Sequence, residues 1–418
     1  MHGSDPTGRA SSVTSGAPSP QSMMSPTTLL WLIAGSLMLQ PLSTDLYLAS
    51  LPHLARDFAV TPAAVQQTLS LFVIGFGCAQ LIGGPLSDRF GRRPVLLWGL
   101  VIYIGASCAC ALAPTLELLV AARFVQAVGC CMAAVVARAM VRDAFAPAAG
   151  ARMLAKASSL LSLAPLFGPV LGGYLQVEFG WRAAFVFHTA FGIALLVAAA
   201  HLFRETNLHP DPAATRIGRL LATYRRIAGA DIFWAWMLPG ALSYAAIFAF
   251  ISGSSFVLID VLGVPTHYYG YCFAFGVTGY LLGTIVCRRL LARRGMARTL
   301  MAGAALALFS GLLFALLVLA GWRHWSVVLL CMFLTMCAHG INFPCVQAGA
   351  VAPFAREAGA AAGLLGFSTM LAALVAGAWV GASHDGTLLP LALICAAIGV
   401  LLFGSAWALR GRRAAAPG

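Results

Sequence analysis

The sequence predicts an all-α membrane protein whose twelve transmembrane helices form two six-helix pseudo-symmetric bundles. Composition is the first observation: 60% of the 418 residues are apolar, only 9% are charged, and the mean hydropathy is +0.88. A soluble domain carries about 25% charged residues, so this surface is not suited to water. The second observation is a series of twelve apolar runs, since about 20 apolar residues suffice to span a bilayer core. The third is a polar interval at 204–232 that leaves six runs on each side.

The elements follow one another in a regular order. Residues 1–26 are rich in Ser, Pro, Gly and Thr and lack an apolar stretch, so we expect a disordered cytoplasmic tail rather than a signal peptide. The N-terminal bundle covers 27–203, a cytoplasmic linker 204–232, the C-terminal bundle 233–409 and a second cytoplasmic tail 410–418. The apolar runs lie at 28–50, 65–86, 95–113, 116–138, 153–175, 182–203, 233–258, 267–287, 299–320, 325–348, 358–381 and 388–409.

The distribution of Lys and Arg predicts the orientation of the chain. With the N-terminus inside, the loops of the outer face hold only Arg56, Arg182 and Arg323, and Arg123 lies within a span. The other 22 of the 26 basic residues lie in cytoplasmic loops, tails and helix ends. Because cytoplasmic segments of membrane proteins are enriched in Lys and Arg, we expect both termini in the cytoplasm and the chain in a bacterial inner membrane.

Composition also excludes several classes of protein. A net charge of +13 fits a nucleic-acid binder, but the basic residues occur in short blocks between apolar runs, as membrane topology requires. All eleven cysteines lie in apolar runs without a CxxC pair, so neither a disulfide framework nor a zinc site is indicated. The sequence has no HExxH motif, no P-loop and no paired catalytic carboxylates. We therefore expect neither an enzyme nor an ATP-driven pump, and no cofactor, metal or nucleic-acid partner.

A tight cytoplasmic turn joins runs 2 and 3, where residues 84–94 read GPLSDRFGRRP. Gly91 supplies the backbone freedom that the reversal of the chain needs. Arg89 and Arg92 hold the turn on the cytoplasmic side, but the preference for basic residues there does not account for the acid Asp88.

The same turn is repeated in the second half of the chain. A shift of 204 residues places Gly91 on Gly295, which ends the basic segment RRLLARRG at 288–295. The second copy has Ala292 where the first has Asp88. A degenerate repeat of this kind predicts two related halves.

The turn at 84–94 resembles the loop signature of the major facilitator superfamily, and the resemblance spans about residues 28–410. Two further segments point to its twelve-helix drug:proton antiporters and to their bicyclomycin/chloramphenicol-resistance (Bcr/CflA) branch: the antiporter motif in run 5 and the pair formed by runs 10 and 11. One departure is Leu37, since some drug exporters carry a second acid at that position. The segments that resemble family motifs are 45–52 (DLYLASLP), 123–129 (RFVQAVG), 164–173 (APLFGPVLGG), 340–344 (GINFP) and 358–363 (AGAAAG).

Asp45 and Arg123 are the only charged residues well inside the predicted spans. Burying a charge in hydrocarbon costs at least about 2.5–3.5 kcal/mol, so such residues face a cavity or a partner. Each lies about 9–10 Å from the outer end of its run, so similar depth predicts that they form an ion pair. A static structural pair is one interpretation. The other is that Asp45 carries the coupling proton and Arg123, which cannot lose its own proton, is its electrostatic reference.

The resemblance implies a conformational switch at the cytoplasmic turn. In that family the loop acid, here Asp88, stabilises the outward-facing state against neighbouring helix ends and a basic residue after run 4, here Arg142 or Arg138. An anion near the start of run 11 would also favour that helix dipole. A solvated loop salt bridge is the alternative. The predicted switch residues are Asp88, Arg89, Gly91, Arg92 and Arg142.

Two groups of residues have weaker signals. Run 5 has glycines four residues apart and prolines that permit bending, which indicates close helix packing at Pro165, Gly168, Pro169 and Gly172. The second group consists of apolar, aromatic and amide side chains that either line a substrate pocket or serve packing, except that Gln126, one turn from Arg123, either orients that arginine or contacts the substrate. Its members are Gln126, Tyr244, Phe248, Phe273, Phe275, Met336, His339 and Asn342.

The function expected from these features is secondary active efflux by alternating access. A proton enters as a hydrophobic or amphipathic drug leaves, and the proton gradient supplies the energy. A cavity with one acid, one arginine and apolar walls suits such compounds better than sugars, which need many polar partners. An exporter or uniporter of an endogenous metabolite on the same fold is the alternative. We expect a monomer whose partners are the substrate, protons and the lipid bilayer.

Overall fold

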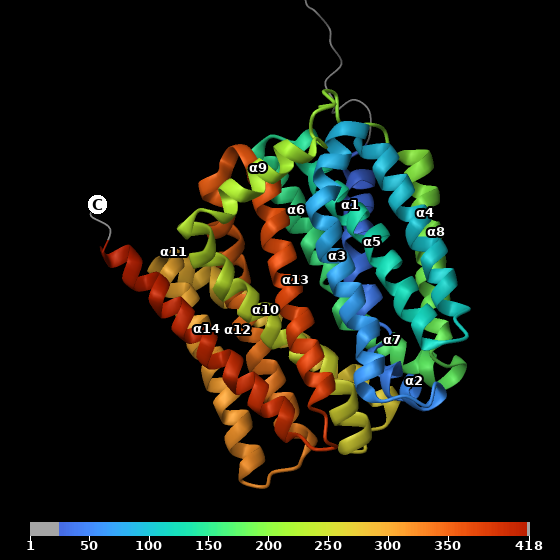
Figure 1. Ribbon diagram of the computed structural model, residues 1–418, viewed down its shortest axis with the longest axis vertical. Coiled ribbons are helices and arrows are strands. Elements are labelled where there is room, and N and C mark those ends of the chain that lie inside the picture. Colours follow the sequence, from blue (N-terminus) through green and yellow to red (C-terminus); the bar gives the residue numbers. More distant parts are fainter. Residues whose placement is uncertain (1–24, 416–418) are drawn as a thin grey trace, which may run out of the picture.

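The computed structural model describes residues 25–415, apart from the side chains of 147, 148, 151, 356 and 410–415. Within this region every regular element is helical (Figure 1). The predicted tail at 1–26 lies outside the described residues except for its last two. The long helices are α1 (Pro26–Asp45), α3 (Pro62–Phe90), α4 (Arg92–Ala111), α5 (Leu116–Ala144), α6 (Pro147–Leu161), α7 (Leu163–Phe179), α8 (Arg182–Leu202), α9 (Ile217–Ala228), α10 (Asp231–Ser255), α11 (Thr266–Leu319), α12 (Trp325–Val351), α13 (Ala358–Ala382) and α14 (Leu389–Ala415). The short ones are η2 (Leu48–Ser50), α2 (Leu51–Asp57), η3 (Phe256–Val261) and η4 (Ala352–Glu357).

The helices provide the twelve predicted membrane crossings. Eleven helical stretches of the described chain are long and apolar enough to span a bilayer. One of them, α11, has 54 residues and is interrupted at Gly295, where φ is +71°, so it accounts for two crossings. Gly91, its counterpart in the first half, has φ of +96°. Both repeated turns therefore use the left-handed backbone conformation that glycine adopts without strain.

Four boundaries differ from the prediction. Run 1 is not one helix, because α1 ends at Asp45 and the chain continues through η2 into α2. Run 5 is divided at Ser162 into α6 and α7. The linker contains the helix α9, and α14 continues to Ala415, into the predicted tail.

The break in α1 and the helix α9 have identifiable causes. Pro41 lies inside α1 and supplies no N–H, and the Thr44 hydroxyl bonds back to the Gln40 and Pro41 carbonyls at 3.2 Å. In α9, apolar residues recur at helical spacing between the arginines that make the linker polar. Its Ile227 is buried, and the Tyr224 hydroxyl donates to the Leu81 carbonyl of α3 at 2.6 Å. The helix therefore lies with one face against the bundle.

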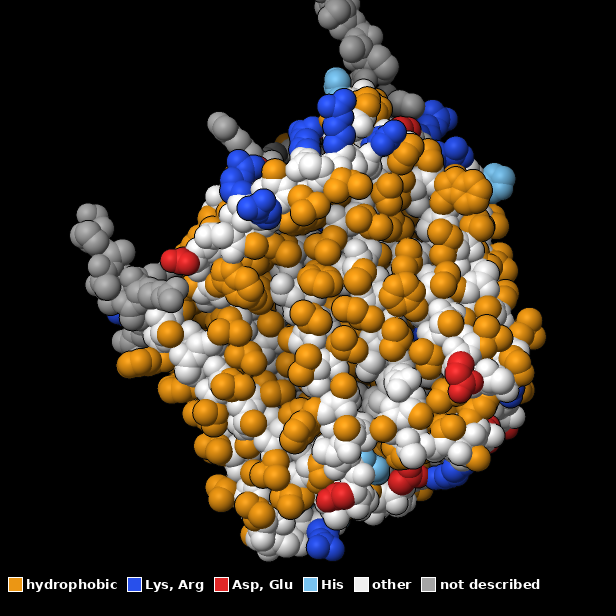
Figure 2. Space-filling model, in the orientation of Figure 1, with side chains coloured by type: hydrophobic (Ala, Val, Ile, Leu, Met, Phe, Trp, Pro, Cys, Tyr) orange, Lys and Arg blue, Asp and Glu red, His pale blue; other side chains and the backbone are white. Residues whose placement is uncertain are grey.

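Helices α1–α8 form one half of the molecule and α10–α14 the other (Figure 1). We call the end with α9 and the Gly91 turn the linker end, and the opposite end, with the turns 58–61 and 383–388, the far end. Most of the Lys and Arg side chains visible in Figure 2 gather at the linker end, above a surface that is largely apolar. The two halves meet where α3 packs along α13 and α7 along α11.

Helix α7 is wedged between the two halves at the far end. On one side a Cβ added at Gly172 would collide with the Leu46 carbonyl, directly after the break in α1. On the other side Gly270 of α11 contacts the backbone of Pro169 and Val170. Glycines thus allow three helix backbones to approach closely.

We expect Gly172→Ala to destabilise the protein, because the new methyl group cannot be accommodated without moving the α1 backbone. Such overpacking costs about 1–3 kcal/mol. Thermal unfolding of the purified protein in detergent measures the effect. Gly105→Ala in α4 is the matched control, since a Cβ there has no neighbour within 4 Å. An equal midpoint for both variants would contradict the close approach.

Candidate functional site

Asp45 lies where the first helix breaks and the two halves meet. It is the last residue of α1 and its side chain is buried, accepting a hydrogen bond from the Thr44 hydroxyl at 2.7 Å. Tyr244 of α10 and Tyr269 of α11 are close enough to interact with it electrostatically. No ion pair to Asp45 exists among the described residues. The carboxyl group therefore faces the other half with a neutral hydroxyl as its hydrogen-bond partner.

Arg123 of α5 is completely buried inside the first half. Its guanidinium donates to the Ser43 carbonyl at 2.9 Å and to Gln126 Oε1 at 2.5 Å. The guanidinium carbon also lies 4.6 Å from the ring centre of Tyr47 and 4.2 Å from that of Phe72. Hydrogen bonds and cation–π contacts thus surround this cation with partners from its own half.

The predicted ion pair between Asp45 and Arg123 is therefore not formed in this structure. Both residues lie at similar depth, but depth along a helix does not determine which way a side chain points. Asp45 lies within electrostatic range of Tyr244 of α10 and Tyr269 of α11, whereas Arg123 is bonded to the carbonyls of Ser43 in α1 and Thr68 in α3. The two charges therefore have different partners, although both lie next to the last turn of α1.

A polar network that the sequence did not predict continues from Arg123. Gln126 Nε2 donates to the Ser107 hydroxyl at 2.7 Å, so Gln126 belongs to this network rather than to the surface between the halves. The Tyr103 and Ser43 hydroxyls lie 2.8 Å apart. His188 of α8 bonds to the Leu42 carbonyl at 3.1 Å. Serines, a tyrosine and a histidine spread over three apolar runs give no sequence signal of their own.

Several predicted pocket residues form one cluster in the second half. His339 Nδ1 lies 3.0 Å from the Ser243 hydroxyl, which Asn342 Nδ2 approaches at 3.5 Å. The His339 ring stacks on Phe343 at 5.1 Å and Tyr280 at 5.9 Å.

Tyr244 connects this cluster to Asp45. Its ring meets that of His339 edge-on at 5.9 Å and stacks on Phe248 at 6.4 Å. Met336 and Phe273 are buried in the same half, whereas Phe275 is 47% exposed and stacks on Phe333. Tyr280 and Phe343 were not among the predicted residues.

The Gly91 turn between α3 and α4, at the linker end, is held by a network of ion pairs and hydrogen bonds. Asp88 pairs with Arg92 at 2.6 Å, and Arg92 pairs with Asp143 at the end of α5 at 2.7 Å. Arg89 donates to the Thr215 hydroxyl at 2.5 Å. Glu205, which no sequence pattern indicated, accepts hydrogen bonds from the backbone N–H groups of Arg92 at 2.8 Å and of the next residue at 3.0 Å, and so caps α4.

The expected contact between Asp88 and a basic residue after run 4 is not formed. Asp88 instead forms its ion pair with Arg92, four residues further along the chain. Arg142 is exposed and points across to α13, where its Nη1 lies 3.8 Å from the Cβ position of Gly359. The arginine, rather than the acid, thus reaches the start of α13.

At the far end, polar contacts join the two halves directly. Arg56, in the last turn of α2, pairs with Asp260 of the π-helical turn η3 at 2.5 Å. His53 Nε2 lies 3.1 Å from the Thr266 hydroxyl, and Gln66 donates to the Ser252 carbonyl. These contacts close the interface between the halves at this end.

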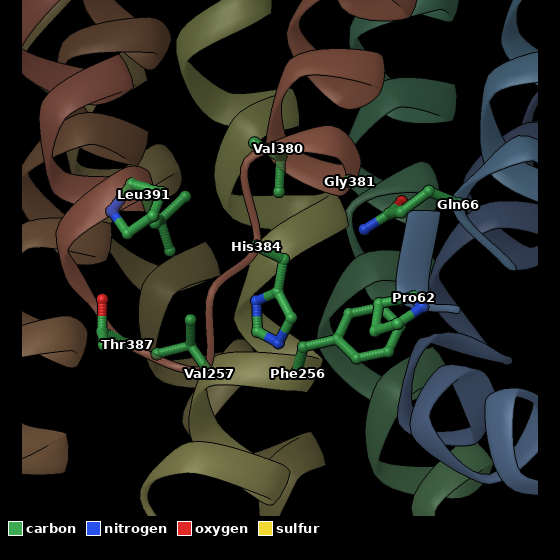
Figure 3. Close-up of a pocket in the computed structure, with 11 residues that line it drawn as sticks. Pro62, Gln66, Phe256, Val257, Val380, Gly381, His384, Thr387 and Leu391 are labelled. Carbon is green, nitrogen blue, oxygen red and sulfur yellow. The ribbon is translucent and has the colours of Figure 1, made fainter. Parts of the chain in front are cut away.

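A small pocket lies behind these contacts, between α3, α10, α13 and α14 (Figure 3). Gln66 projects toward it from α3 and His384 from the turn between α13 and α14, with Phe256 beside His384. Its volume of about 10 Å³ holds roughly one water molecule, so it is too small for an organic substrate. Over the described part of the chain, no group of three or more His, Cys, Asp or Glu residues is placed to bind a metal.

Comparison with known proteins places the chain among transporters. The sequence profile of the Major Facilitator Superfamily matches residues 33–378. The bicyclomycin resistance protein homolog of Haemophilus influenzae is 27% identical over 375 residues, which are 88% of this chain and 92% of that protein. The multidrug resistance protein MdtL of Escherichia fergusonii is 28% identical over 383 residues, with coverage of 87% and 92%. The crystal structure of a D-xylose-proton symporter shares the fold, with a TM-score of 0.73, 15% identity and coverage of 92% and 96%.

We expect Arg123→Ala to lower stability strongly, because it leaves the Ser43 carbonyl and Gln126 unpaired in a dry interior. The cost is about 3 kcal/mol or more, since each unsatisfied buried group costs about 1–3 kcal/mol. Arg123→Lys keeps the charge but loses the planar fork, so its loss should be smaller. Thermal unfolding in detergent measures both variants against Arg323→Ala, an exposed arginine in a far-end turn. A wild-type midpoint in Arg123→Ala would show that the network is not structural.

Proposed function

This chain belongs to the Major Facilitator Superfamily, and on that premise we propose that it exports hydrophobic or amphipathic drugs in exchange for protons. The names of the Haemophilus and Escherichia relatives support a role in drug resistance. The Lys and Arg side chains at the linker end support a cytoplasmic position for that end, and so for both termini. The chain then acts as a Bcr/CflA-type monomer in a bacterial inner membrane, powered by the proton gradient.

The position of Asp45 is the observation that carries this proposal. A buried carboxyl group whose hydrogen-bond partner is a hydroxyl, without a counter-charge, can be neutralised by a proton at low cost. It lies between the halves, so opening of the interface to water would favour its charged form. Alternating access would therefore change the proton affinity of Asp45 between the two sides of the membrane. Arg123 keeps its charge throughout and supports the fold of the first half.

The residues of the second half around Tyr244 are consistent with an amphipathic substrate. Tyr244, Phe248 and His339 provide aromatic faces, and the few hydroxyl and amide groups there are mostly bonded to one another. These side chains offer van der Waals contact and few unpaired hydrogen-bond donors or acceptors. Such a site suits drugs better than sugars.

The asymmetry between the two ends supports alternating access. The far end is closed by α7 against α11 and by the Arg56–Asp260 pair. At the linker end, Arg138 and Arg142 of α5 and Lys156 of α6 are exposed. We assign this conformation to the state that accepts drug from the cytoplasm. The turn with Asp88, Arg89, Gly91 and Arg92 then acts as a switch whose ion pairs are exchanged when the linker end closes, with Arg142 near α13 as one partner.

We expect Asp45→Asn to abolish proton-coupled export, because an amide cannot take up and release the proton. Expression and folding should stay near normal, since the amide can still accept the hydrogen bond from Thr44. Susceptibility of an efflux-deficient host to a panel of hydrophobic antibiotics and dyes measures export in cells. Asp385→Asn, in a far-end loop, is the control for loss of one acid.

Vesicle transport with and without a proton uncoupler separates the two forms of the hypothesis. Export that survives both the uncoupler and Asp45→Asn would identify a uniporter or metabolite exporter instead. Undiminished drug resistance in Asp45→Asn at matched protein level would exclude Asp45 as the proton carrier.

We expect Arg56→Gln to raise the population in which the far end is open. The pair is partly exposed and contributes at most about 1 kcal/mol, so the shift should be no more than about fivefold. Labelling of Ser254→Cys by a membrane-impermeant maleimide reports the opening, because Ser254 is buried behind the far-end contacts. The same protein without that substitution corrects for the native cysteines.

Arg219→Gln is the matched control, since it breaks an equally exposed pair with Asp211 inside the linker. If both arginine variants label at the wild-type rate, the Arg56–Asp260 pair does not hold the halves together.

A further inference from the structure

A groove on the first half lies between α3 and α5 near the far end. It has a volume of about 580 Å³ and is lined only by these two helices and the turn before α3. Its floor is formed by apolar side chains such as Leu71, Phe124 and Val125, of which the last two are 36% and 47% exposed. No helix of the second half contributes to it, so the groove is separate from the Asp45 site.

Two polar side chains stand in this groove without a partner in the described chain. Glu117 is the second residue of α5, at the edge of the predicted hydrocarbon layer. Gln67 lies five residues into α3, or about 7.5 Å along the helix axis from Pro62. Both are exposed, and neither takes part in any hydrogen bond or ion pair observed among residues 25–415.

The two residues differ in how well the fold explains them. Glu117 lies in the first turn of a helix, where the dipole favours a carboxylate and water is close, so by itself it needs no ligand. Gln67 has no such explanation, because it lies beyond the first turn of α3 and its amide has no hydrogen bond beside an apolar groove. The groove thus presents, from the far end inward, a carboxylate, an amide and an apolar floor. A phospholipid has a headgroup, then phosphate and ester groups, then acyl chains in the same order.

We propose that this groove binds one phospholipid with a primary ammonium headgroup from the leaflet at the far end. The Glu117 carboxylate accepts charge-assisted hydrogen bonds from the ammonium group. The Gln67 amide donates to a phosphate or ester oxygen of the same lipid. One acyl chain lies along Leu71, Phe124 and Val125.

The charge of the groove selects among lipids. An anionic headgroup such as phosphatidylglycerol would be repelled by Glu117. The quaternary ammonium of phosphatidylcholine has no N–H group and cannot donate a hydrogen bond to the carboxylate. Phosphatidylethanolamine satisfies both requirements. The inference does not depend on the direction, coupling or substrate of transport.

Native mass spectrometry of the full chain tests this assignment. The protein is purified in detergent and mixed with phosphatidylethanolamine, phosphatidylcholine or phosphatidylglycerol of identical acyl chains. One phosphatidylethanolamine per chain should be retained in preference to the other two. Glu117→Gln and Gln67→Leu should each weaken retention by about tenfold, the effect of losing a hydrogen bond to a charged or buried polar group. Glu117→Asp should retain most of the binding.

Glu178→Gln is the matched control, since Glu178 is an exposed acid near the far end of α7 and is not part of the groove. Monodisperse elution of every variant confirms folding. Equal retention of the three lipids, or wild-type retention by Glu117→Gln, would reduce the groove to ordinary lipid contact and overturn the proposal. Glu117-dependent binding of tetraphenylphosphonium without retention of phosphatidylethanolamine would overturn it as well, because the groove would then accept a lipophilic cation instead.

Discussion

The need to satisfy polar groups without water is the constraint on which this structure depends. In a bilayer core an unpaired charge or amide is costly, so each polar side chain within a span needs a partner from the chain or a function that changes its surroundings. Arg123 meets the first condition completely, with carbonyl, amide and aromatic partners from its own half. Asp45 does not, since its hydrogen-bond partner is the neutral hydroxyl of Thr44. Of the two buried charges, Arg123 is therefore fully satisfied by the fold and Asp45 is not.

The break after Asp45 links this electrostatic contrast to the packing of the helices. Because α1 ends there, the Leu46 backbone is available to receive Gly172 of α7. The same helix α7 contacts α11 of the other half through Gly270. A movement of the second half against the first must therefore act on the segment that holds Asp45. The segment that holds Asp45 and the position of α7 are thus linked by direct contact, without a long pathway between them.

The two halves share a plan but not the same chemistry. Gly91 and Gly295 occupy equivalent turns, and both have positive φ. The first turn carries Asp88 and its ion pairs with Arg92 and Asp143, whereas the second has Ala292 at the equivalent position. Likewise the first half contributes the buried charges and the second an aromatic cluster around His339. The repeat thus gives the two halves the same turns, and the differences between the copies give the first half its buried charges and the second its aromatic cluster.

The sequence by itself determined the membrane class, the twelve crossings, the turn glycines and the chemical identity of Asp45 and Arg123 as unusual charges. These properties follow from hydropathy, charge and glycine positions, which are additive along the chain and need no knowledge of packing. Only the tertiary structure decided that Asp45 and Arg123 face different neighbours, that Gln126 belongs to an internal network, and that Arg92 rather than Arg142 pairs with Asp88. These depend on the rotation of each helix about its axis and on breaks such as the one after Asp45. Both are set by contacts between residues far apart in sequence, such as Gly172 with Leu46, which no local pattern records.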